Sequence, residues 1–289
     1  MSVRAWFERA RSEGFAIGSF NVANLETIKA VVETAAEMRS PILLESSPGE
    51  TKWVGANTMV AIVRSLSKEH GIPVFVNLDH AEKLEDCMTA IEAGYDLIHF
   101  DGSHGDLDEN IRITKEVVKA AHAKNLLVEA EIDALPTKSS EIYKDKIPDE
   151  VIKKSYSDPE KVKAFAEETG VDTMATVFGN VHGILLQQEE VLDFDLVARI
   201  RAANPDIFLS MHGSSGIPEV NVTRAIQVGK IVKVNISTEI RKAYRETLER
   251  VLKENPDQLA VYKFMPPVIE AIKAVARRKI EAYGSAGKA

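Results

Sequence analysis

Eight short apolar segments alternate with stretches of helical periodicity, and this alternation restricts the fold of the chain more than any other feature. The apolar segments are short and rich in β-branched residues, and their alternation with helical stretches is typical of parallel βα units. We place the strands at residues 15–22, 41–47, 73–79, 97–103, 126–132, 173–180, 206–213 and 231–238. The helical patterns cover residues 25–38, 56–70, 83–93, 108–124, 159–169, 193–203, 218–228 and 239–254.

Eight strand–helix units are the number that closes a (β/α)8 barrel of the TIM type. The chain has 289 residues, and such a barrel typically needs about 250. We therefore predict the α/β class and a single (β/α)8 barrel domain over residues 1–289, with an open doubly wound sheet as the alternative. Gly94, Gly170 and Gly229 stand at predicted helix ends, where glycine readily forms a left-handed C-cap.

Two segments fall outside the repeat. Residues 133–158 follow the fifth strand and form a loop far longer than the roughly two to six residues usual between a strand and a helix. Such a loop is either a lid over a site or a solvated excursion, and the sequence leaves both open. Residues 257–289 carry a further helical pattern, which predicts an additional C-terminal helix packed on the barrel or on a neighbouring subunit.

Charge and composition narrow the possible partners. The chain has 36 Lys and Arg against 44 Asp and Glu, a formal net charge of −8, whereas nucleic-acid binders need clustered cations. No stretch approaches the roughly 18 apolar residues of a membrane helix, and the N-terminal residues lack a signal-peptide pattern. The single cysteine, Cys87, excludes an intrachain disulfide. We expect a cytoplasmic protein that binds neither nucleic acid nor membranes.

Three of the seven histidines stand where predicted strands end: His80, His182 and His212. Active sites of such barrels lie at the carboxyl ends of the strands, so these imidazoles are expected to converge. Converging imidazoles beside carboxylates, here Asp79 and Asp101, are typical of a catalytic metal site. The remaining histidines are interpreted as ordinary: His70 and His122 lie in helices, His99 lies inside a strand, and His104 lies in a loop.

The last three strands end in glycines and hydroxyl side chains. Gly183, Gly213 and Gly216 let backbone N–H groups approach an oxyanion closely, and Ser215 and the 235–238 turn add donors. Barrels frequently bind phosphate on the loops after strands seven and eight, so these residues predict a phosphate site next to the metal.

Several motifs carry a family resemblance. SPILLESS, VNLDHAEKLEDCMTAIEAGYDLIHFDGS, FGNVHG, HGSSGIPE and VNISTEIRKAY, in this order, resemble the motifs of the class II, zinc-dependent fructose-bisphosphate and tagatose-bisphosphate aldolases. The resemblance runs from about residue 14 to the final GSAGKA. It implies one catalytic Zn²⁺, with a possible second site, often accompanied by Na⁺ or K⁺, and a homodimer or homotetramer.

The resemblance also implies roles for individual residues. His80, His182 and His212 match the zinc ligands, Asp79 matches the catalytic acid/base, and Asp101 and Glu131 match alternative or neighbouring metal ligands. Positions that match the cradle for the phosphate of dihydroxyacetone phosphate are Gly183, Gly213, Ser215, Ser237 and Thr238. Asn235 matches the residue that hydrogen-bonds the enediolate, and Asn21 and Ser47 match polar positions near the other half of the substrate.

The sequence departs from the family pattern after the fifth strand. A glycine-rich acidic stretch that carries a proton-donating glutamate is replaced by DALPTKSSEIYKDK, in which Glu141 is a candidate for that role. Glu45 stands where glutamine is common and is expected to add negative charge near the distal part of the substrate. The lysines are interpreted as surface residues, since no Schiff base is needed.

The resemblance thus implies a metal-dependent aldolase of carbohydrate metabolism, with a place in reactions such as glycolysis. It would reversibly cleave fructose 1,6-bisphosphate, tagatose 1,6-bisphosphate or a related ketose phosphate to dihydroxyacetone phosphate and an aldehyde, through a zinc-stabilised enediolate. Because the altered positions concern the aldehyde side, that aldehyde need not be glyceraldehyde 3-phosphate. The alternatives are a non-catalytic partner subunit of an aldolase and another metal-dependent sugar-phosphate barrel enzyme.

Overall fold

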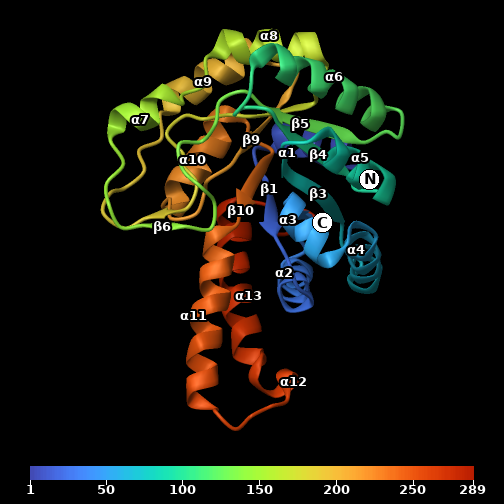
Figure 1. Cartoon of the computed structure of the whole chain (residues 1–289), viewed down its shortest axis with the longest axis vertical. Coiled ribbons are helices and arrows are strands. Elements are labelled where there is room, and N and C mark those ends of the chain that lie inside the picture. Colours follow the sequence, from blue (N-terminus) through green and yellow to red (C-terminus); the bar gives the residue numbers. More distant parts are fainter.

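The computed structural model describes residues 1–289 and contains a closed barrel of eight parallel strands (Figure 1). Neighbouring strands follow the chain around the barrel, and Ile17 of the first strand pairs with Lys233 of the last, which closes it. This closure confirms the predicted (β/α)8 barrel and shows that the doubly wound alternative is wrong. The barrel strands are β1 (Ile17–Asn21), β2 (Ile42–Ser46), β3 (Val74–Ala81), β4 (Leu97–Asp101), β5 (Leu127–Glu131), β7 (Thr173–Ala175), β9 (Phe208–Met211) and β10 (Lys233–Ile236).

All eight predicted helices are present. They are α2 (Leu25–Glu37), α4 (Ala56–His70), α5 (Leu84–Ala93), α6 (Leu107–His122), α8 (Pro159–Thr169), α9 (Phe194–Ala203), α10 (Glu219–Gly229) and α11 (Thr238–Glu254). Gly94 and Gly170 form left-handed C-caps as predicted, with φ of 90° and 72°. The prediction for Gly229 is wrong, because Lys230 takes the left-handed position with φ of 49°. Gly229 is required by packing instead, since a Cβ there would lie 2.7 Å from Val197 Cγ2.

Two helices within the first 60 residues were not predicted. Helix α1 (Val3–Glu13) inserts Trp6 and Phe7 against the first inward residues of the strands, such as Phe75 and Phe208. These aromatic residues seal the amino-terminal mouth of the barrel. Helix α3 (Pro48–Val54) begins directly after β2 with Ser47 as its N-cap in a capping box.

The long loop 133–158 folds back over the carboxyl end of the barrel. Its strand β6 (Ile142–Tyr143) pairs with β8 (Ile184–Leu185), which follows β7 in the chain, and α7 (Asp149–Lys154) lies beyond it. The hydroxyl of Thr137 donates to the carbonyl of His182 over 2.6 Å. The loop thus contacts the strand-end surface at two points.

The C-terminal segment forms α12 (Val261–Phe264) and α13 (Pro266–Ala282). Helices α11 and α13 run side by side as a hairpin that projects from the barrel in Figure 1. The additional C-terminal helix is therefore confirmed, and it packs on α11 and α2 through buried side chains such as Val268 and Ile272. None of the helices combines the length and apolarity that crossing a membrane would require.

Candidate metal and phosphate site

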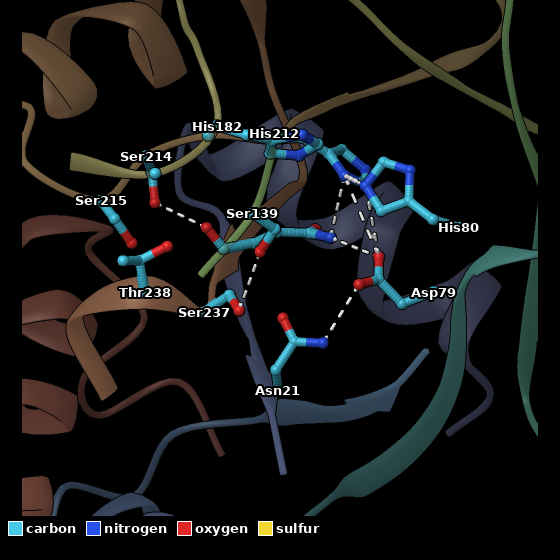
Figure 2. A pocket seen from close by; sticks show the side chains of 13 residues that line it. Asn21, Asp79, His80, Ser139, His182, His212, Ser214, Ser215, Ser237 and Thr238 are labelled. Carbon is cyan, nitrogen blue, oxygen red and sulfur yellow. Dashed lines mark hydrogen bonds and ion pairs between the residues drawn. The ribbon is translucent and has the colours of Figure 1, made fainter. Parts of the chain in front are cut away.

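A pocket opens at the carboxyl ends of the strands, and its lining is polar throughout. Eleven residues singled out from the sequence line it together with Ser139 and Ser214, which sequence reasoning missed. We call this cavity the strand-end pocket; Figure 2 shows Asp79 and His80 facing Ser215 and Thr238 across it. The eleven are Asn21, Asp79, His80, His182, Gly183, His212, Gly213, Ser215, Asn235, Ser237 and Thr238.

Asp79 and His80 reach the same site because β3 contains a bulge. Consecutive residues of a regular strand point to opposite faces, so an unbroken β3 could not present both. Between Leu78 and Ala81 the pairing advances three residues on β3 but only two on β4. His80 adopts a left-handed conformation with φ of 46°, which costs a non-glycine residue about 1–2 kcal/mol. This strained backbone brings Asp79 Oδ1 within 3.8 Å of His80 Nε2.

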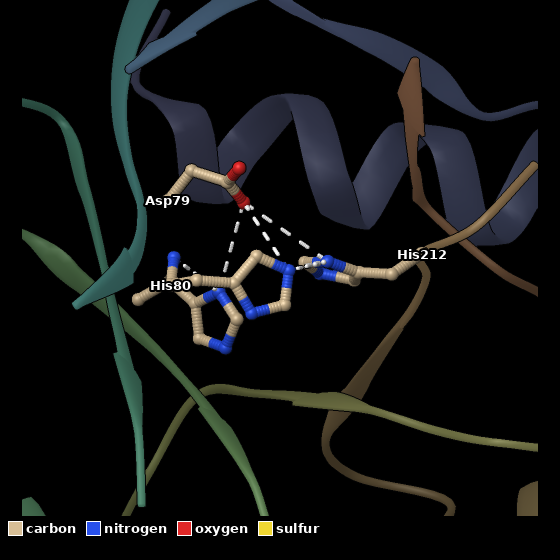
Figure 3. Close-up of side chains that lie close together, drawn as sticks. Asp79, His80 and His212 are labelled. Carbon is tan, nitrogen blue, oxygen red and sulfur yellow. Dashed lines mark hydrogen bonds and ion pairs between the residues drawn. The ribbon is translucent and has the colours of Figure 1, made fainter. Parts of the chain in front are cut away.

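His80 and His212 point one ring nitrogen at each other, 2.9 Å apart (Figure 3). Their opposite ring nitrogens contact carboxylates, since His80 Nδ1 lies 2.8 Å from Asp101 and His212 Nε2 lies 2.8 Å from Glu129. An ionised carboxylate only accepts, so both of those nitrogens carry protons, and with neutral rings the two facing nitrogens would both hold lone pairs. Two facing lone pairs need a shared positive charge, and a metal ion fits this donor set.

The pKa values of the imidazoles agree with this interpretation. Burial lowers the pKa of His80, but Asp79, Asp101 and Glu131 outweigh it and raise the pKa to about 10. Burial lowers the pKa of His212 to about 3, although its hydrogen bond to Glu129 opposes this. The site therefore favours one positive charge between the two rings, which a bound cation supplies.

Asp79, His80, His99 and His212 form one group of potential metal ligands, and His80, Asp101 and Glu131 form a second. His182 belongs to neither group. Its ring centre lies 5.0 Å from that of His80 and 6.3 Å from that of His212. Burial lowers the pKa of His182 to about 3, so its imidazole is neutral and able to coordinate.

Asp79 is held as a carboxylate by two amides. Asn21 Nδ2 donates to Oδ2 over 3.1 Å, and Asn235 Nδ2 donates to Oδ1 over 3.0 Å. Burial raises the pKa of Asp79, but the positive charge of His80 and contacts with His99 and His212 outweigh it and hold the pKa well below its usual value. Asp79 is thus an ionised carboxylate beside the metal-ligand candidates.

A layer of charged residues lies inside the barrel beneath the pocket. Lys233 is fully buried and donates to Glu129 over 2.6 Å, with Glu45 at 3.8 Å. The expectation that all lysines are surface residues is therefore wrong. The expectation for Glu45 is also wrong, because its buried carboxylate accepts from Ser19 and Asn77 rather than facing the substrate side.

The hydroxyl-rich side of the pocket meets the N-terminus of α11. Ser237 is the N-cap and makes no side-chain capping bond, so donors at this helix end are available for an anion. The loop 133–158 lies here too: Ser139 Oγ donates to Ser237 Oγ over 3.2 Å, and the Ser140 N–H donates to Thr238 Oγ1 over 3.1 Å. Gly183 has φ of 88°, and a Cβ there would lie 2.7 Å from the Glu141 carbonyl.

The other predicted site residues lie outside the pocket lining. Asp101 and Glu131 contact His80 from behind, at 2.8 and 3.6 Å. Ser47 caps α3 and donates to Glu50, and Asn21 donates to the same carboxylate over 3.2 Å. The side chain of Glu141 is exposed beside β6.

Comparisons with known proteins agree with this geometry. The sequence profile of the family described as fructose-bisphosphate aldolase class-II matches residues 1–288. A Klebsiella oxytoca protein named D-tagatose-1,6-bisphosphate aldolase subunit GatY is 36% identical over 283 residues, or 97% of this chain and 96% of that protein.

Solved structures are similar over the whole chain. The crystal structure of the YdjI aldolase from Escherichia coli K12 has a TM-score of 0.84 at 32% identity and covers 100% of this chain and 98% of that one. The fructose-bisphosphate aldolase of Campylobacter jejuni has a TM-score of 0.84 at 23% identity, with coverage of 100% and 97%, and supports the fold.

Proposed function

Because the chain belongs to the class II fructose-bisphosphate aldolase family, we propose that it reversibly cleaves a ketose phosphate to dihydroxyacetone phosphate and an aldehyde. The protein is an aldolase and therefore a carbon–carbon lyase. The observation that carries the proposal is the ionised Asp79 beside the paired imidazoles of His80 and His212. This arrangement supports a base next to a site for a cation.

In the proposed reaction, Asp79 accepts the proton of the substrate C4 hydroxyl as the C3–C4 bond breaks. It returns the proton during condensation. Asn21 and Asn235 orient this carboxylate, and Asn235 is also the candidate donor to the enediolate oxygen. A bound cation supplies Lewis-acid stabilisation of the negative charge that develops on the substrate oxygens.

We propose Zn²⁺ as that cation, held by His80, His182 and His212, with Asp101 and Glu131 as alternative or neighbouring ligands. The carboxylates behind His80 and His212 and the neutral imidazole of His182 support this assignment. For the substrate phosphate we propose Gly183, Gly213, Ser215, Ser237 and Thr238, with Na⁺ or K⁺ beside it. Ser139 joins this set, because it lines the same pocket and contacts Ser237.

The aldehyde half of the substrate is proposed to extend past Asn21. A second cavity shares Asn21 and is lined by Asn24, Thr27 and Arg241. Arg241 is its only lining cation, and the 2.5 Å ion pair with Glu50 neutralises it. This neutral, hydroxyl-binding lining favours an uncharged hydroxyaldehyde over a triose phosphate. Ser47 would support it through Glu50.

Retro-aldol rates test both parts of the proposal. We expect kcat/KM for ketose 1-phosphates without a second phosphate to exceed that for fructose 1,6-bisphosphate and tagatose 1,6-bisphosphate. Strong preference for fructose 1,6-bisphosphate contradicts the aldehyde proposal, and absence of cleavage of every ketose phosphate contradicts the aldolase reaction of the isolated chain.

Glu141 is proposed as the proton donor to the enediolate, and Glu141→Gln would then slow exchange of the substrate proton.

A non-catalytic subunit is the second candidate, because the Klebsiella oxytoca relative is named as an aldolase subunit. Zinc content and activity of the purified chain alone distinguish the two.

We further propose a homodimer or homotetramer, and a cytoplasmic location for a protein whose one cysteine, Cys87, is buried and free.

A further inference from the structure

His99 lies at the site, but it has no role in the proposed reaction. From the sequence it is interpreted only as an ordinary residue inside a strand. It lies on β4, is completely buried, and packs its ring 4.7 Å from His80 and 5.0 Å from His212. We propose that His99 is a positioning residue that holds the β3 bulge, so that Asp79 and His80 face one site. This inference rests on the proposed function for the roles of those two residues.

The bulge leaves the backbone N–H of His80 in need of an acceptor other than a strand carbonyl. Where β3 carries its extra residue, the regular pairing with β4 is interrupted, and the N–H of His80 points at a side chain instead of a strand carbonyl. His99 Nδ1 accepts this N–H over 3.2 Å. A buried backbone N–H without an acceptor is strongly unfavourable, so His99 stabilises a conformation that His80 would otherwise avoid.

The same contact fixes the tautomer of His99. Because Nδ1 accepts, the proton of the neutral ring lies on Nε2, which faces Glu131 Oε2 at 3.7 Å. His99 is therefore distinct from His80 and His212, whose Nε2 and Nδ1 face each other over 2.9 Å. It lies within the group of potential ligands but contributes an acceptor to the backbone of a ligand.

A matched pair of substitutions tests the role. Asn and Leu have similar size, but only His99→Asn keeps an acceptor close to the position of Nδ1. With zinc alone as the probe, we expect His99→Leu to weaken zinc binding of the metal-stripped protein about 10–100-fold, as loss of partners behind metal ligands does. His99→Asn should stay within about threefold of the unaltered protein, and kcat should follow the same order with KM nearly unchanged.

A purely packing role predicts equal zinc affinity for the two variants, and that result would overturn the proposal. The ligand-field spectrum of the Co²⁺-loaded proteins adds a further check, since only the Leu variant should alter it. The unaltered protein provides a measurement that needs no variant to fold: histidine ¹⁵N shifts should show His99 protonated on Nε2, and protonation on Nδ1 would exclude the proposed contact.

These readouts separate the inference from the proposed function. Zinc affinity and the His99 tautomer require no sugar substrate, so they stand if no ketose phosphate is cleaved. Conversely, ready cleavage of a ketose phosphate together with equal zinc affinity of the two variants would leave the aldolase reaction intact and overturn the positioning role.

Discussion

The carboxylate of Asp79 is the single group whose removal should separate chemistry from metal binding. Asp79→Asn keeps the size of the side chain but removes the base, so kcat should fall by about 10²–10⁴-fold. Zinc content should remain, because the imidazole contacts with Asp101 and Glu129 are untouched. Steady-state kinetics and metal analysis measure both, with the exposed Asp108→Asn as control. An unchanged kcat would show that another group is the base.

The buried carboxyl of Glu190 should make the free energy of unfolding depend on pH. Burial raises the pKa of its carboxyl from 4.5 to about 8, while the Val181 N–H that it accepts opposes this. Between these two values the folded protein holds a proton that the unfolded chain has released, so stability falls as pH rises.

Glu190→Gln keeps the acceptor for Val181 and removes the ionisation. Between pH 5 and about 8, we expect the free energy of unfolding to fall more in the unaltered protein than in the variant. The two decreases should differ by more than about 1 kcal/mol, since each pKa unit corresponds to about 1.4 kcal/mol. Denaturant unfolding at both pH values measures this. Parallel curves for the two proteins would show that Glu190 does not titrate in this range.

At the residue scale, the sequence predicts the polar site residues at the carboxyl ends of the strands. It does not predict the roles of the buried polar residues that lie two positions earlier on the same strands. Inward residues of a strand recur with a period of two, so Asp101 and Glu131 already imply inward positions for His99 and Glu129. Lys233, two residues before Asn235, is an inward residue by the same rule. The bulge of β3 has no such signal, because it depends on the pairing with β4.

At the scale of the elements, the contact of loop 133–158 with the residues at the start of β8 allows a direct test of whether the loop supports phosphate binding. In Gly183→Ala, the added Cβ would lie 2.7 Å from the carbonyl of Glu141 and 2.8 Å from the ring of Tyr143. The loop must then shift away from the phosphate residues, so we expect KM for a ketose phosphate to rise at least about tenfold, a loss of about 1.4 kcal/mol.

Gly71→Ala is the matched control for that variant. Gly71 also has positive φ, 67°, but nothing lies within 4 Å of its added Cβ, and it ends α4 away from the pocket. Both variants should lose about 1–2 kcal/mol of stability from backbone strain. Only Gly183→Ala should alter KM; equal KM values would show that the loop does not support phosphate binding.

Elements that follow hydrophobic periodicity were predictable, and those that depend on the completed barrel were not. The eight outer helices each bury one face and carry that pattern in sequence. Helix α1 was missed because its apolar residues Trp6 and Phe7 are explained only by the barrel mouth that they fill. Strand β7 ends at Ala175 instead of residue 180, since the chain turns toward Gly179, whose φ is 116°.

For the whole molecule, the projecting α11–α13 hairpin is the candidate interface of the proposed oligomer. Leu259 and Tyr262 near its tip are 88% and 77% exposed. Apolar side chains gathered on a projection favour burial against another chain. We expect Leu259→Asp with Tyr262→Asp to lower the mass measured by light scattering, whereas Val220→Asp on α10 should not. An unaltered mass in the double variant would place the interface elsewhere.

The closing pair of the barrel affects how the protein folds. Strands β1 and β10 join Ile17 to Lys233, a sequence separation of 233 − 17 = 216 residues. β1 pairs with β2 on one side, but during synthesis its other edge stays unpaired until the last strand emerges, and such long-range pairing is slow and open to aggregation. Asn21 and Asn235 stand on the two sides of this seam and both donate to Asp79. Catalytic competence should therefore appear only with the final folding step, later than the secondary structure, and the nascent chain should remain inactive until its barrel closes.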